Sequence, residues 1–211
     1  GGIITLCGSG EAADLCSKPI RYIFGDERDR WEESAGKEGD PWELARTRQL
    51  TFYNSKAVEV STPTIKGSSN IETSYNEGTM ERWCNKCPHC GEYSEIPFEQ
   101  IRSQYPENIV GNAKNFAVSD IFYICPECGG VSTEREIKGQ DAKWIADNPN
   151  AYEKNHTRSF RLTSWVSPWS PWEASIIKYL EAVGDPGKMQ VVYNTRFGQL
   201  WENRGEIEDE D

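Results

Sequence analysis

The chain has 211 residues, of which 36% are hydrophobic and 27% charged, and its formal net charge is −11. This length is enough for one domain with a buried core, or for one domain with a small satellite, and the eight Trp and nine Tyr residues exclude a disordered chain. The acidic balance argues against a protein whose whole surface grips DNA, but it leaves open a motor that confines its basic residues to a channel.

Predicted strands and helices alternate in the first 65 residues. Three short apolar runs that end in small or polar residues are typical of buried strands, at residues 3–7, 20–24 and 57–60. A short helix is expected at residues 11–15. A second helix is predicted to begin after Asp40, which is followed by a proline and by Glu43, and to run to about residue 51. This order predicts a parallel α/β sheet.

Further helix signals lie in the second half of the chain. Residues 133–136 form a capping-box pattern, which predicts a helix that carries Trp144. Another capped helix is predicted to begin at residues 170–173 and to end at Gly184. Asp185 begins the last helix, and the acidic residues 206–211 are interpreted as a solvated linker or tail. The helix before Gly184 keeps its apolar residues on one face, namely Trp172, Ile176, Tyr179, Leu180 and Val183.

Two C-x-x-C pairs are the most specific signal in the chain. Cys87 and Cys90 form the first pair, and Cys125 and Cys128 form the second. Four thiolates are the donor set of a structural zinc, and they leave no open position for catalysis. The spacer is long enough for a strand pair, and the glycine after each pair suits a tight turn in which backbone amides approach the sulfurs. Buried free thiols or a redox pair are the alternative interpretations.

The remaining metal-ligand residue types have simpler interpretations. His89 lies inside the first pair and is expected to face solvent. Cys84 is a spare thiol, and its replacing Cys87 as a ligand is the less favoured alternative. Cys7 and Cys16 are interpreted as core cysteines.

An acidic pair follows the second predicted strand. Asp26 and Glu27 stand where a Walker B element has an acid that helps to hold Mg²⁺ and a glutamate that acts as a general base. The carboxyl end of a parallel strand places both in the crevice where α/β sheets bind ligands. By itself this pattern is weak, because a strand that runs into a solvated turn has the same appearance.

The third predicted strand ends in small hydroxyl residues, which include Ser61 and Thr62. In nucleic-acid motors such a strand end senses the γ-phosphate and couples hydrolysis to movement. Its hydroxyls can hydrogen-bond the acids or the catalytic water without adding charge. A plain β-turn with a proline is the alternative.

Five segments together resemble, in the same order, parts of the GpA-like phage terminase large subunits. Residues 15–30 resemble the family's Walker B region, and residues 60–67 are similar to its coupling segment. The two cysteine pairs with their glycines look like its zinc ribbon. Residues 167–169 with the helix at Trp172, and residues 194–202, match the stretch before its nuclease domain. The implied fold is α/β, a partial P-loop NTPase-type parallel sheet with an inserted or appended four-cysteine zinc ribbon and C-terminal helices.

The resemblance also implies roles for single residues. Asp26 would be the acid associated with Mg²⁺, and Glu27 the catalytic base. The coupling segment would include Ser61, Thr62 and Thr64, with Thr62 the first choice for a functional hydroxyl. The two arginines that follow the acids, Arg28 and Arg30, are expected to form surface ion pairs rather than an arginine finger.

The resemblance implies a division into three parts. Residues 1–80 would be the C-terminal half of an ATPase core, residues 81–135 the zinc ribbon, and residues 136–211 a helical segment leading to a nuclease domain that would begin near residue 205. The sequence contains no G-x-x-x-x-G-K-[ST] loop, and it opens directly on a predicted strand. We therefore expect a piece of a larger ATPase and endonuclease, inactive by itself.

The implied partners are those of a packaging motor. The intact protein would use ATP to move double-stranded viral DNA into a procapsid and would cut concatemeric DNA. Its partners would be the small terminase subunit, the portal and further copies of itself, in the cytoplasm of an infected bacterium. Without an 18-residue apolar run or a signal-peptide pattern, no membrane contact is expected. The alternatives are part of a helicase-like motor, or a stand-alone zinc-ribbon module that binds nucleic acid or a protein.

Overall fold

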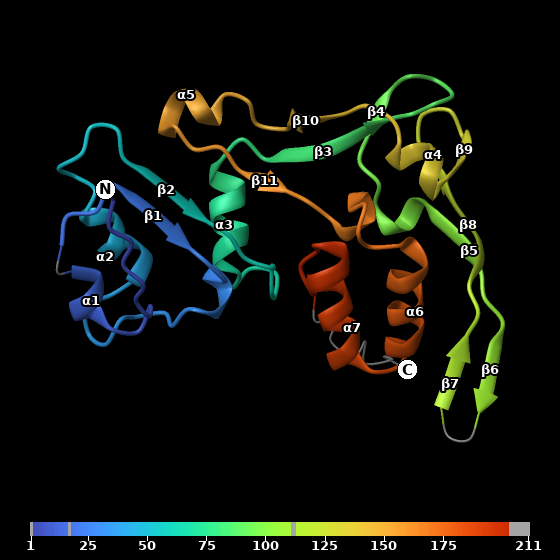
Figure 1. Ribbon diagram of the computed structural model, residues 1–211, viewed down its shortest axis with the longest axis horizontal. Coiled ribbons are helices and arrows are strands. Elements are labelled where there is room, and N and C mark those ends of the chain that lie inside the picture. The colour runs from blue at the N-terminus through green and yellow to red at the C-terminus, as the bar shows by residue number, and fades with distance from the viewer. Residues whose placement is uncertain (1, 17, 111–112, 203–211) are drawn as a thin grey trace, which may run out of the picture. The chain divides into compact units, whose positions relative to one another are not determined.

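The computed structural model describes residues 2–16, 18–110 and 113–202. It divides the chain into two compact units, residues 1–62 and residues 63–211, and each is described by itself (Figure 1). Among these residues, no helix has the length and apolar character that crossing a membrane requires. The acidic segment at residues 206–211 lies outside the described residues.

The first unit consists of a two-stranded parallel sheet and two short α-helices (Figure 1). The strands pair from Tyr22 opposite Lys56 to Gly25 opposite Glu59, which confirms their predicted parallel direction. Their carboxyl ends therefore lie at one edge. In chain order the elements are α1 (Ala12–Cys16), β1 (Tyr22–Gly25), the 3-10 turn η1 (Arg28–Arg30), α2 (Pro41–Thr47) and β2 (Lys56–Glu59).

Helix α2 begins as predicted but ends earlier. The Asp40 carboxylate accepts hydrogen bonds from the backbone N–H groups of Trp42 and Glu43. The helix ends at Thr47 rather than near residue 51. Beyond it the chain tightens into turns, and the buried Gln49 side chain donates from one amide nitrogen to backbone carbonyls at the start of both strands, at 3.0 and 2.8 Å. These hydrogen bonds connect the turns after the helix to the start of both strands.

The predicted first strand is wrong. Residues 3–7 form no regular structure, and Ile3 is 95% exposed. The two observed strands are also less buried than predicted, since Phe24 is 79% exposed while Ile23 packs on the small core of the unit. Successive side chains of a strand point to opposite faces, and the helices cover only the face that carries Ile23. The expectation of core cysteines fails here too, because Cys7 is exposed and Cys16 half-buried.

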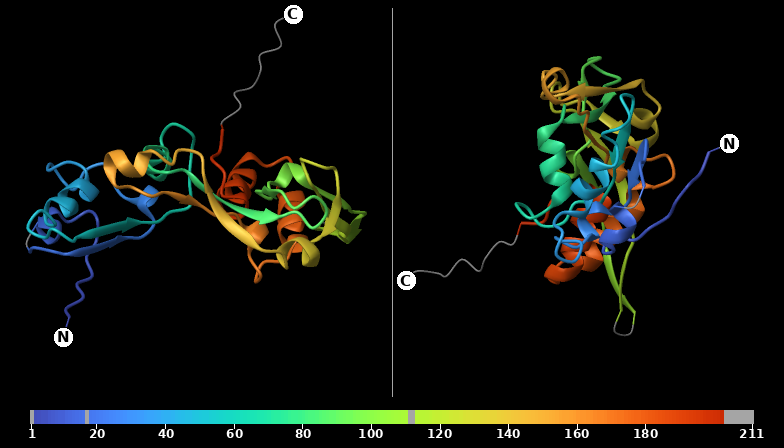
Figure 2. Two further views of the ribbon diagram at one scale, coloured as in Figure 1. Left: turned by 90° about the horizontal axis from the view of Figure 1, so that it is seen from above. Right: turned by 90° about the vertical axis from the view of Figure 1, so that its left-hand side faces the viewer.

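The second unit contains three small sheets and several short helices (Figure 1). In the first sheet β3 lies between β10 and β11 and also pairs with β4, and the second has the order β5–β8–β9. Strands β6 and β7 extend the β5–β8 pair into a hairpin arm (Figure 2). The strands are β3 (Glu81–Lys86), β4 (Tyr93–Ser94), β5 (Ile101–Gln104), β6 (Glu107–Val110), β7 (Ala113–Phe116), β8 (Ser119–Ile124), β9 (Val131–Thr133), β10 (Ala142–Ala146) and β11 (Phe160–Arg161).

The spacer between the cysteine pairs contains the antiparallel pair β5–β8, which confirms the predicted strand pair.

The helices of the second unit lie before, between and after these strands. The helical elements are α3 (Asn70–Glu77), η2 (Phe98–Gln100), α4 (Glu134–Lys138), α5 (Ala151–Asn155), η3 (Ser164–Val166), α6 (Trp172–Ala182), α7 (Pro186–Val192) and the π-helical turn η4 (Tyr193–Phe197).

The capping box at Thr133 is present, but the helix that it begins is short. The Thr133 hydroxyl accepts from the Glu136 N–H, and the Glu136 carboxylate accepts from the Thr133 N–H at 2.8 Å. Helix α4 then ends at Lys138, so the prediction that it carries Trp144 is wrong. Trp144 lies on β10 opposite Trp83, and their ring centroids are 5.1 Å apart. Pairing with the distant strand β3 outweighs continuation of the helix.

Helix α6 begins in the predicted place, but the local cap predicted at residues 170–173 is wrong, because its N-cap residue is Pro171, whose side chain has no hydrogen-bond acceptor. A distant residue caps the helix instead. The backbone N–H of Trp172 donates to the Glu134 carboxylate of α4, at 3.1 and 3.2 Å. The predicted apolar face is buried along most of its length, but Val183 is 59% exposed. Gly184 follows the end of the helix with φ +88°, and Asp185 caps α7 by accepting from the Lys188 N–H, as predicted.

Aromatic side chains form the core of the second unit. Phe197 is fully buried and stacks on Phe98 and Trp165, with centroid distances of 4.5 and 5.3 Å. Cys87 and Cys125 belong to the same buried cluster. The cysteine pairs are therefore built into the core of this unit and are not an isolated appendage.

Candidate functional site

The predicted ATPase residues lie at the carboxyl edge of the β1–β2 pair. Asp26 and Glu27 directly follow β1, while Ser61 and Thr62 follow β2 by one residue. Because the strands are parallel and in register, the two sequence motifs come to the same edge of the sheet. Both acidic side chains are exposed, so they are accessible to a ligand from solvent.

Glu27 has an unusual backbone conformation. Its φ and ψ are 52° and 48°, in the left-handed region that residues with a side chain seldom adopt. Its N–H donates to the Asp26 carboxylate at 3.0 Å, and the indole N–H of Trp31 donates to the Asp26 carbonyl at 2.8 Å. The turn that carries the acids is thus hydrogen-bonded on the Asp26 side of Glu27.

Ser61 binds the same turn from β2. Its hydroxyl accepts from the Asp29 N–H at 3.1 Å and donates to the Thr62 carbonyl at 3.0 Å. The sequence suggested that these hydroxyls contact the acidic side chains. In the structure Ser61 instead contacts backbone that follows the acids, whereas Thr62 and Thr64 are half-buried.

Arg28 contradicts its predicted place on the surface. It is only 4% exposed, and its guanidinium pairs with Asp40 at 2.7 Å and with Glu59 at 3.5 Å. The guanidinium also lies over the Trp31 ring, 5.3 Å from the centroid. Because Asp40 and Glu59 are distant from Arg28 in sequence, no local sequence pattern indicates this ion pair. The side chain of Arg30 is exposed, as expected.

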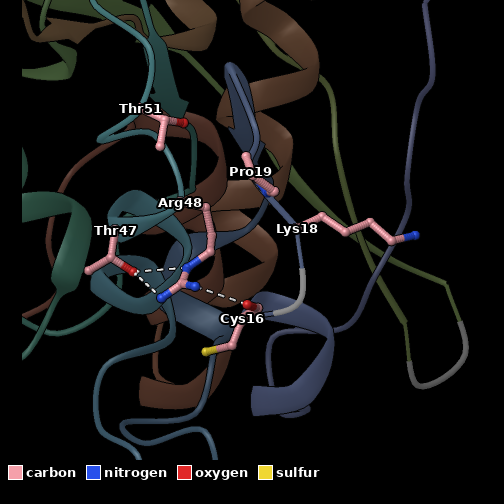
Figure 3. A pocket seen from close by; sticks show the side chains of 6 residues that line it. All are labelled: Cys16, Lys18, Pro19, Thr47, Arg48 and Thr51. Atoms are coloured by element: carbon pink, nitrogen blue, oxygen red, sulfur yellow. Dashed lines mark hydrogen bonds between the residues drawn. The ribbon is translucent and has the colours of Figure 1, made fainter.

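A small pocket in the first unit lies at the ends of the two helices and has a volume of about 130 Å³ (Figure 3). Arg48 occupies its polar side, donating to the Cys16 carbonyl and to the Thr47 hydroxyl at 3.0 Å each. Binding sites for small molecules commonly have about 300–1,000 Å³. The pocket is therefore too small for a nucleotide. The hydrogen bonds of Arg48 across it connect the ends of the two helices. Its lining consists of Cys16, Lys18, Pro19, Thr47, Arg48 and Thr51.

The four predicted metal ligands come together in the second unit. The sulfur atoms of Cys87, Cys90, Cys125 and Cys128 all lie within 4.8 Å of one another. The Cys87–Cys128 and Cys90–Cys125 sulfur distances are 3.9 and 4.0 Å. A tetrahedral zinc with Zn–S bonds of about 2.3 Å separates its sulfurs by about 3.8 Å. The donor set and its spacing therefore fit zinc.

The two turns that carry the cysteines have the same hydrogen bonds. The N–H of Gly91 donates to the Cys87 carbonyl at 3.0 Å, and that of Gly129 to the Cys125 carbonyl at 2.9 Å. Both glycines have positive φ, as the tight turns require. Backbone N–H groups also point to sulfur, as predicted, with His89 N–H 3.4 Å from the Cys87 sulfur.

The environment of Cys87 favours its thiolate. Burial raises the pKa of this thiol, but hydrogen bonds from the backbone N–H groups of Cys90 and His89 oppose this effect. The net result is a pKa lowered to about 6. A thiolate is the form that binds metal. Cys84 differs, because burial raises its pKa and its sulfur lies 3.7 Å from the Arg82 carbonyl, outside the four-sulfur cluster.

His89 connects the two cysteine turns. It is exposed, as predicted, and its Nε2 lies 2.9 Å from the Val131 carbonyl. Its ring covers Gly130, where an added Cβ would lie 2.6 Å from the ring. Sequence reasoning missed this contact, because nothing in a C-x-x-C pair indicates which residue of the other turn it meets.

Comparison with known proteins identifies two parts of one family. The model of "Phage terminase large subunit gpA, ATPase domain" matches residues 1–144, and that of "Terminase large subunit gpA, endonuclease domain" matches residues 157–211. The second match begins well before residue 205, where the sequence placed the start of a nuclease domain. No solved structure matches the chain.

Two curated relatives carry the same name, "Terminase, large subunit". The protein of Enterobacteria phage P21 is 26% identical over 92% of this chain, and that of Escherichia phage lambda is 24% identical over 93%. The chain spans only about a third of the length of either relative, 32% and 33%. With the ATPase-domain model matching more than half of its length, the chain belongs to the family of gpA-type phage terminase large subunits.

Proposed function

We propose that this chain is part of the large subunit of a DNA-packaging terminase. In the intact protein, ATP hydrolysis drives double-stranded viral DNA into a procapsid, and an endonuclease domain cuts concatemeric DNA. The family membership supports this function. Within the chain, the observation that carries it is the parallel pairing of β1 and β2, which brings an acidic pair and a hydroxyl-rich strand end to one edge.

The proposed division of labour at this edge follows from the chemistry of the side chains. The exposed carboxylate of Asp26 is a hard oxygen donor that suits Mg²⁺. Bound Mg–ATP would supply the phosphoryl group and the charge neutralisation that its transfer needs. Glu27 accepts a proton from the attacking water. Ser61 and Thr62 form the coupling segment, with the Ser61 contact to backbone beyond Glu27 linking the two strand ends.

Mutation of the acids tests this function. In a full-length large subunit that contains this segment, Glu27→Gln and Asp26→Asn should each lower kcat for ATP hydrolysis by about a hundredfold or more, since a general base contributes about that much. Glu33→Gln is a matched control, because Glu33 is an exposed acid six positions beyond Glu27. Unchanged hydrolysis in the Glu27 variant would reject the motor function and leave a zinc-ribbon binding module as the better hypothesis.

The boundaries and the activity of the chain by itself are part of the proposal. Residues 1–80 contribute to the ATPase core, residues 81–135 form the zinc ribbon, and residues 136–211 lead into the nuclease region and overlap residues 157–211, which the endonuclease-domain model matches. The sequence lacks a phosphate-binding loop with its lysine. The purified 211-residue chain should therefore hydrolyse no ATP, and measurable turnover by it would contradict this assignment.

We further propose that the four-cysteine cluster binds a structural zinc. The support is the convergence of four sulfurs within 4.8 Å of one another and the burial of two of them in the core. Purified under reducing conditions, the chain should contain one equivalent of zinc by elemental analysis. Cys125→Ser should lose the metal and unfold the ribbon, because the free energy of metal binding becomes folding free energy.

Cys84 provides the control for the zinc experiment. It is as buried as Cys125, at 2% exposure each, but lies outside the cluster. Cys84→Ser should keep the metal and lose only packing energy. Zinc below about half an equivalent in the unsubstituted chain would contradict the site, and loss of zinc from the Cys84 variant alone would move the ligand assignment to that residue.

The proposed partners are double-stranded DNA, the small terminase subunit, the portal of the procapsid and further copies of the large subunit. The place of action is the cytoplasm of an infected bacterium. The net charge of −11 indicates that DNA contact is confined to a limited part of the surface. It also favours a ribbon that stabilises the fold or contacts protein over one that grips DNA.

A further inference from the structure

The turn that presents Glu27 needs a physical explanation for its shape. A left-handed backbone is unfavourable for a residue with a side chain, so neighbouring contacts have to hold Glu27 at φ 52°. Such local strain persists where the surroundings over-determine it. The contacts on the two sides of Glu27 therefore determine how the turn presents its carboxylate.

Both flanks of Glu27 are fixed by hydrogen bonds. On one side the Trp31 indole N–H holds the Asp26 carbonyl at 2.8 Å. On the other side the Arg28 N–H donates to the Val60 carbonyl at 3.1 Å, which joins the turn to the end of β2. Glu27 lies between two anchored peptide groups, and one of the anchors is the backbone of Arg28.

The side chain of Arg28 locks this anchor in place. Its guanidinium is buried between Asp40 at the start of α2 and Glu59 at the end of β2, at 2.7 and 3.5 Å. A buried charge that loses its partner is strongly unfavourable, so the guanidinium is confined to the space between the two carboxylates. Asp40 uses its other oxygen to cap α2, with the Trp42 N–H as donor. One arginine thus joins the acidic turn to a helix and to the neighbouring strand.

We infer that Arg28 is a positioning residue for the ATPase reaction, which holds Glu27 in the left-handed conformation by tying the turn to α2 and β2. This inference rests on the proposed function of Glu27. It excludes a second role for the same side chain, because a guanidinium that is 4% exposed and paired with two carboxylates does not reach out as an arginine finger.

The test uses a full-length large subunit that contains this segment and compares four variants. Arg28→Lys keeps the charge but loses the planar fork that reaches both carboxylates. Asp40→Asn removes the charge that Arg28 pairs with, while asparagine remains a good helix cap. Arg30→Lys is the matched control on the exposed side of the same turn. Glu27→Gln reports on the proposed function itself.

Three quantities separate positioning from a purely structural role. The binding stoichiometry of a fluorescent ATP analogue counts the folded sites, its Kd reports their affinity, and kcat for ATP hydrolysis is then expressed per bound site. Misplacement of a reacting group by about 1 Å costs up to about a hundredfold in rate, so Arg28→Lys and Asp40→Asn should lower kcat per site by about ten- to a hundredfold. Their nucleotide stoichiometry and Kd, and the activity of the Arg30 variant, should stay unchanged.

Each other outcome overturns the inference in a recognisable way. If Glu27→Gln abolishes hydrolysis while the variants at Arg28 and Asp40 leave kcat per site unchanged, the positioning role is wrong and the proposed function stands. The positioning role is equally wrong if these variants lose activity only in proportion to lost nucleotide sites, since that is a loss of fold. If Glu27→Gln leaves hydrolysis unchanged, the proposed function fails, and the role of Arg28 fails with it.

Discussion

The ion pair between Glu81 and Arg158 allows a stability prediction with a defined sign and pH dependence. Glu81 begins β3 and is buried, and its carboxylate accepts two hydrogen bonds from Arg158 at 2.8 and 2.7 Å and one from the Thr79 hydroxyl at 2.8 Å. The Arg158 side chain is 54% exposed. The pair is thus intermediate between a buried and a surface ion pair, and it joins β3 to the segment before β11.

The two partners should not be equivalent. Arg158→Gln leaves the buried carboxylate of Glu81 with only Thr79, so we expect a loss of about 2 kcal/mol in the free energy of unfolding, the middle of the range for hydrogen bonds to charged groups. Glu81→Gln should cost about 1 kcal/mol, because the exposed guanidinium regains water and the new amide still accepts from Thr79. Removing one partner from a fully buried ion pair would cost more, about 3–5 kcal/mol, but the exposure of Arg158 excludes that value here.

The pH dependence follows from the pKa of Glu81. The hydrogen bonds from Arg158 hold this pKa below its ordinary value, although burial opposes them. The folded state therefore binds the proton less readily than the unfolded state, so the pair stabilises the protein above the unfolded pKa, which is about 4.3. This contribution is lost as the pH falls through the lower folded pKa. The difference between the unsubstituted protein and Glu81→Gln should accordingly shrink below about pH 4.

Urea unfolding followed by tryptophan fluorescence, at neutral and acidic pH, measures these differences. The exposed pair Lys178–Glu181 has the same 2.7 Å distance, so Glu181→Gln serves as a control that should change the free energy by less than about 0.5 kcal/mol. A loss from Arg158→Gln no larger than this control would refute the argument that burial of the carboxylate makes the pair matter. So would a Glu81→Gln difference that grows on acidification.

Two further substitutions test the packing of each unit. Phe197→Ala should lower the free energy of unfolding by about 3–5 kcal/mol, because this fully buried ring is the centre of the aromatic core, whereas Trp169→Ala at an 89% exposed position should have little effect. Equal effects on the urea midpoint would show that the core is placed wrongly. Gly25→Ala would put a Cβ 2.9 Å from the Trp42 ring, so we expect a cost of about 1–3 kcal/mol from overpacking beside the acidic turn. A variant as stable as the unsubstituted protein would contradict this close approach.

Most features that depend on residues a few positions apart were predicted correctly from the sequence, but the local cap expected at residues 170–173 does not form. The caps at Asp40, Thr133 and Asp185 all form, because a cap needs only a side-chain oxygen and a backbone N–H two or three residues later. The cysteine turns follow the same logic, since the residues after Cys87 and Cys125 determine each turn locally. Alternation of strand and helix also indicated the parallel pair that brings the acidic and hydroxyl segments to one edge.

Sequence by itself thus determined most of the caps and turns, the motif residues and the family resemblance, while partners distant in the chain decided the rest. Arg28 was expected on the surface because nothing near it in sequence shows that Asp40 and Glu59 enclose it. Trp144 was expected in a helix because the capping box precedes it, but pairing with β3 places it on a strand. Hydrogen bonds within a helix or turn are formed locally, whereas burial and strand pairing depend on which distant segments meet, and only the tertiary structure contains that information.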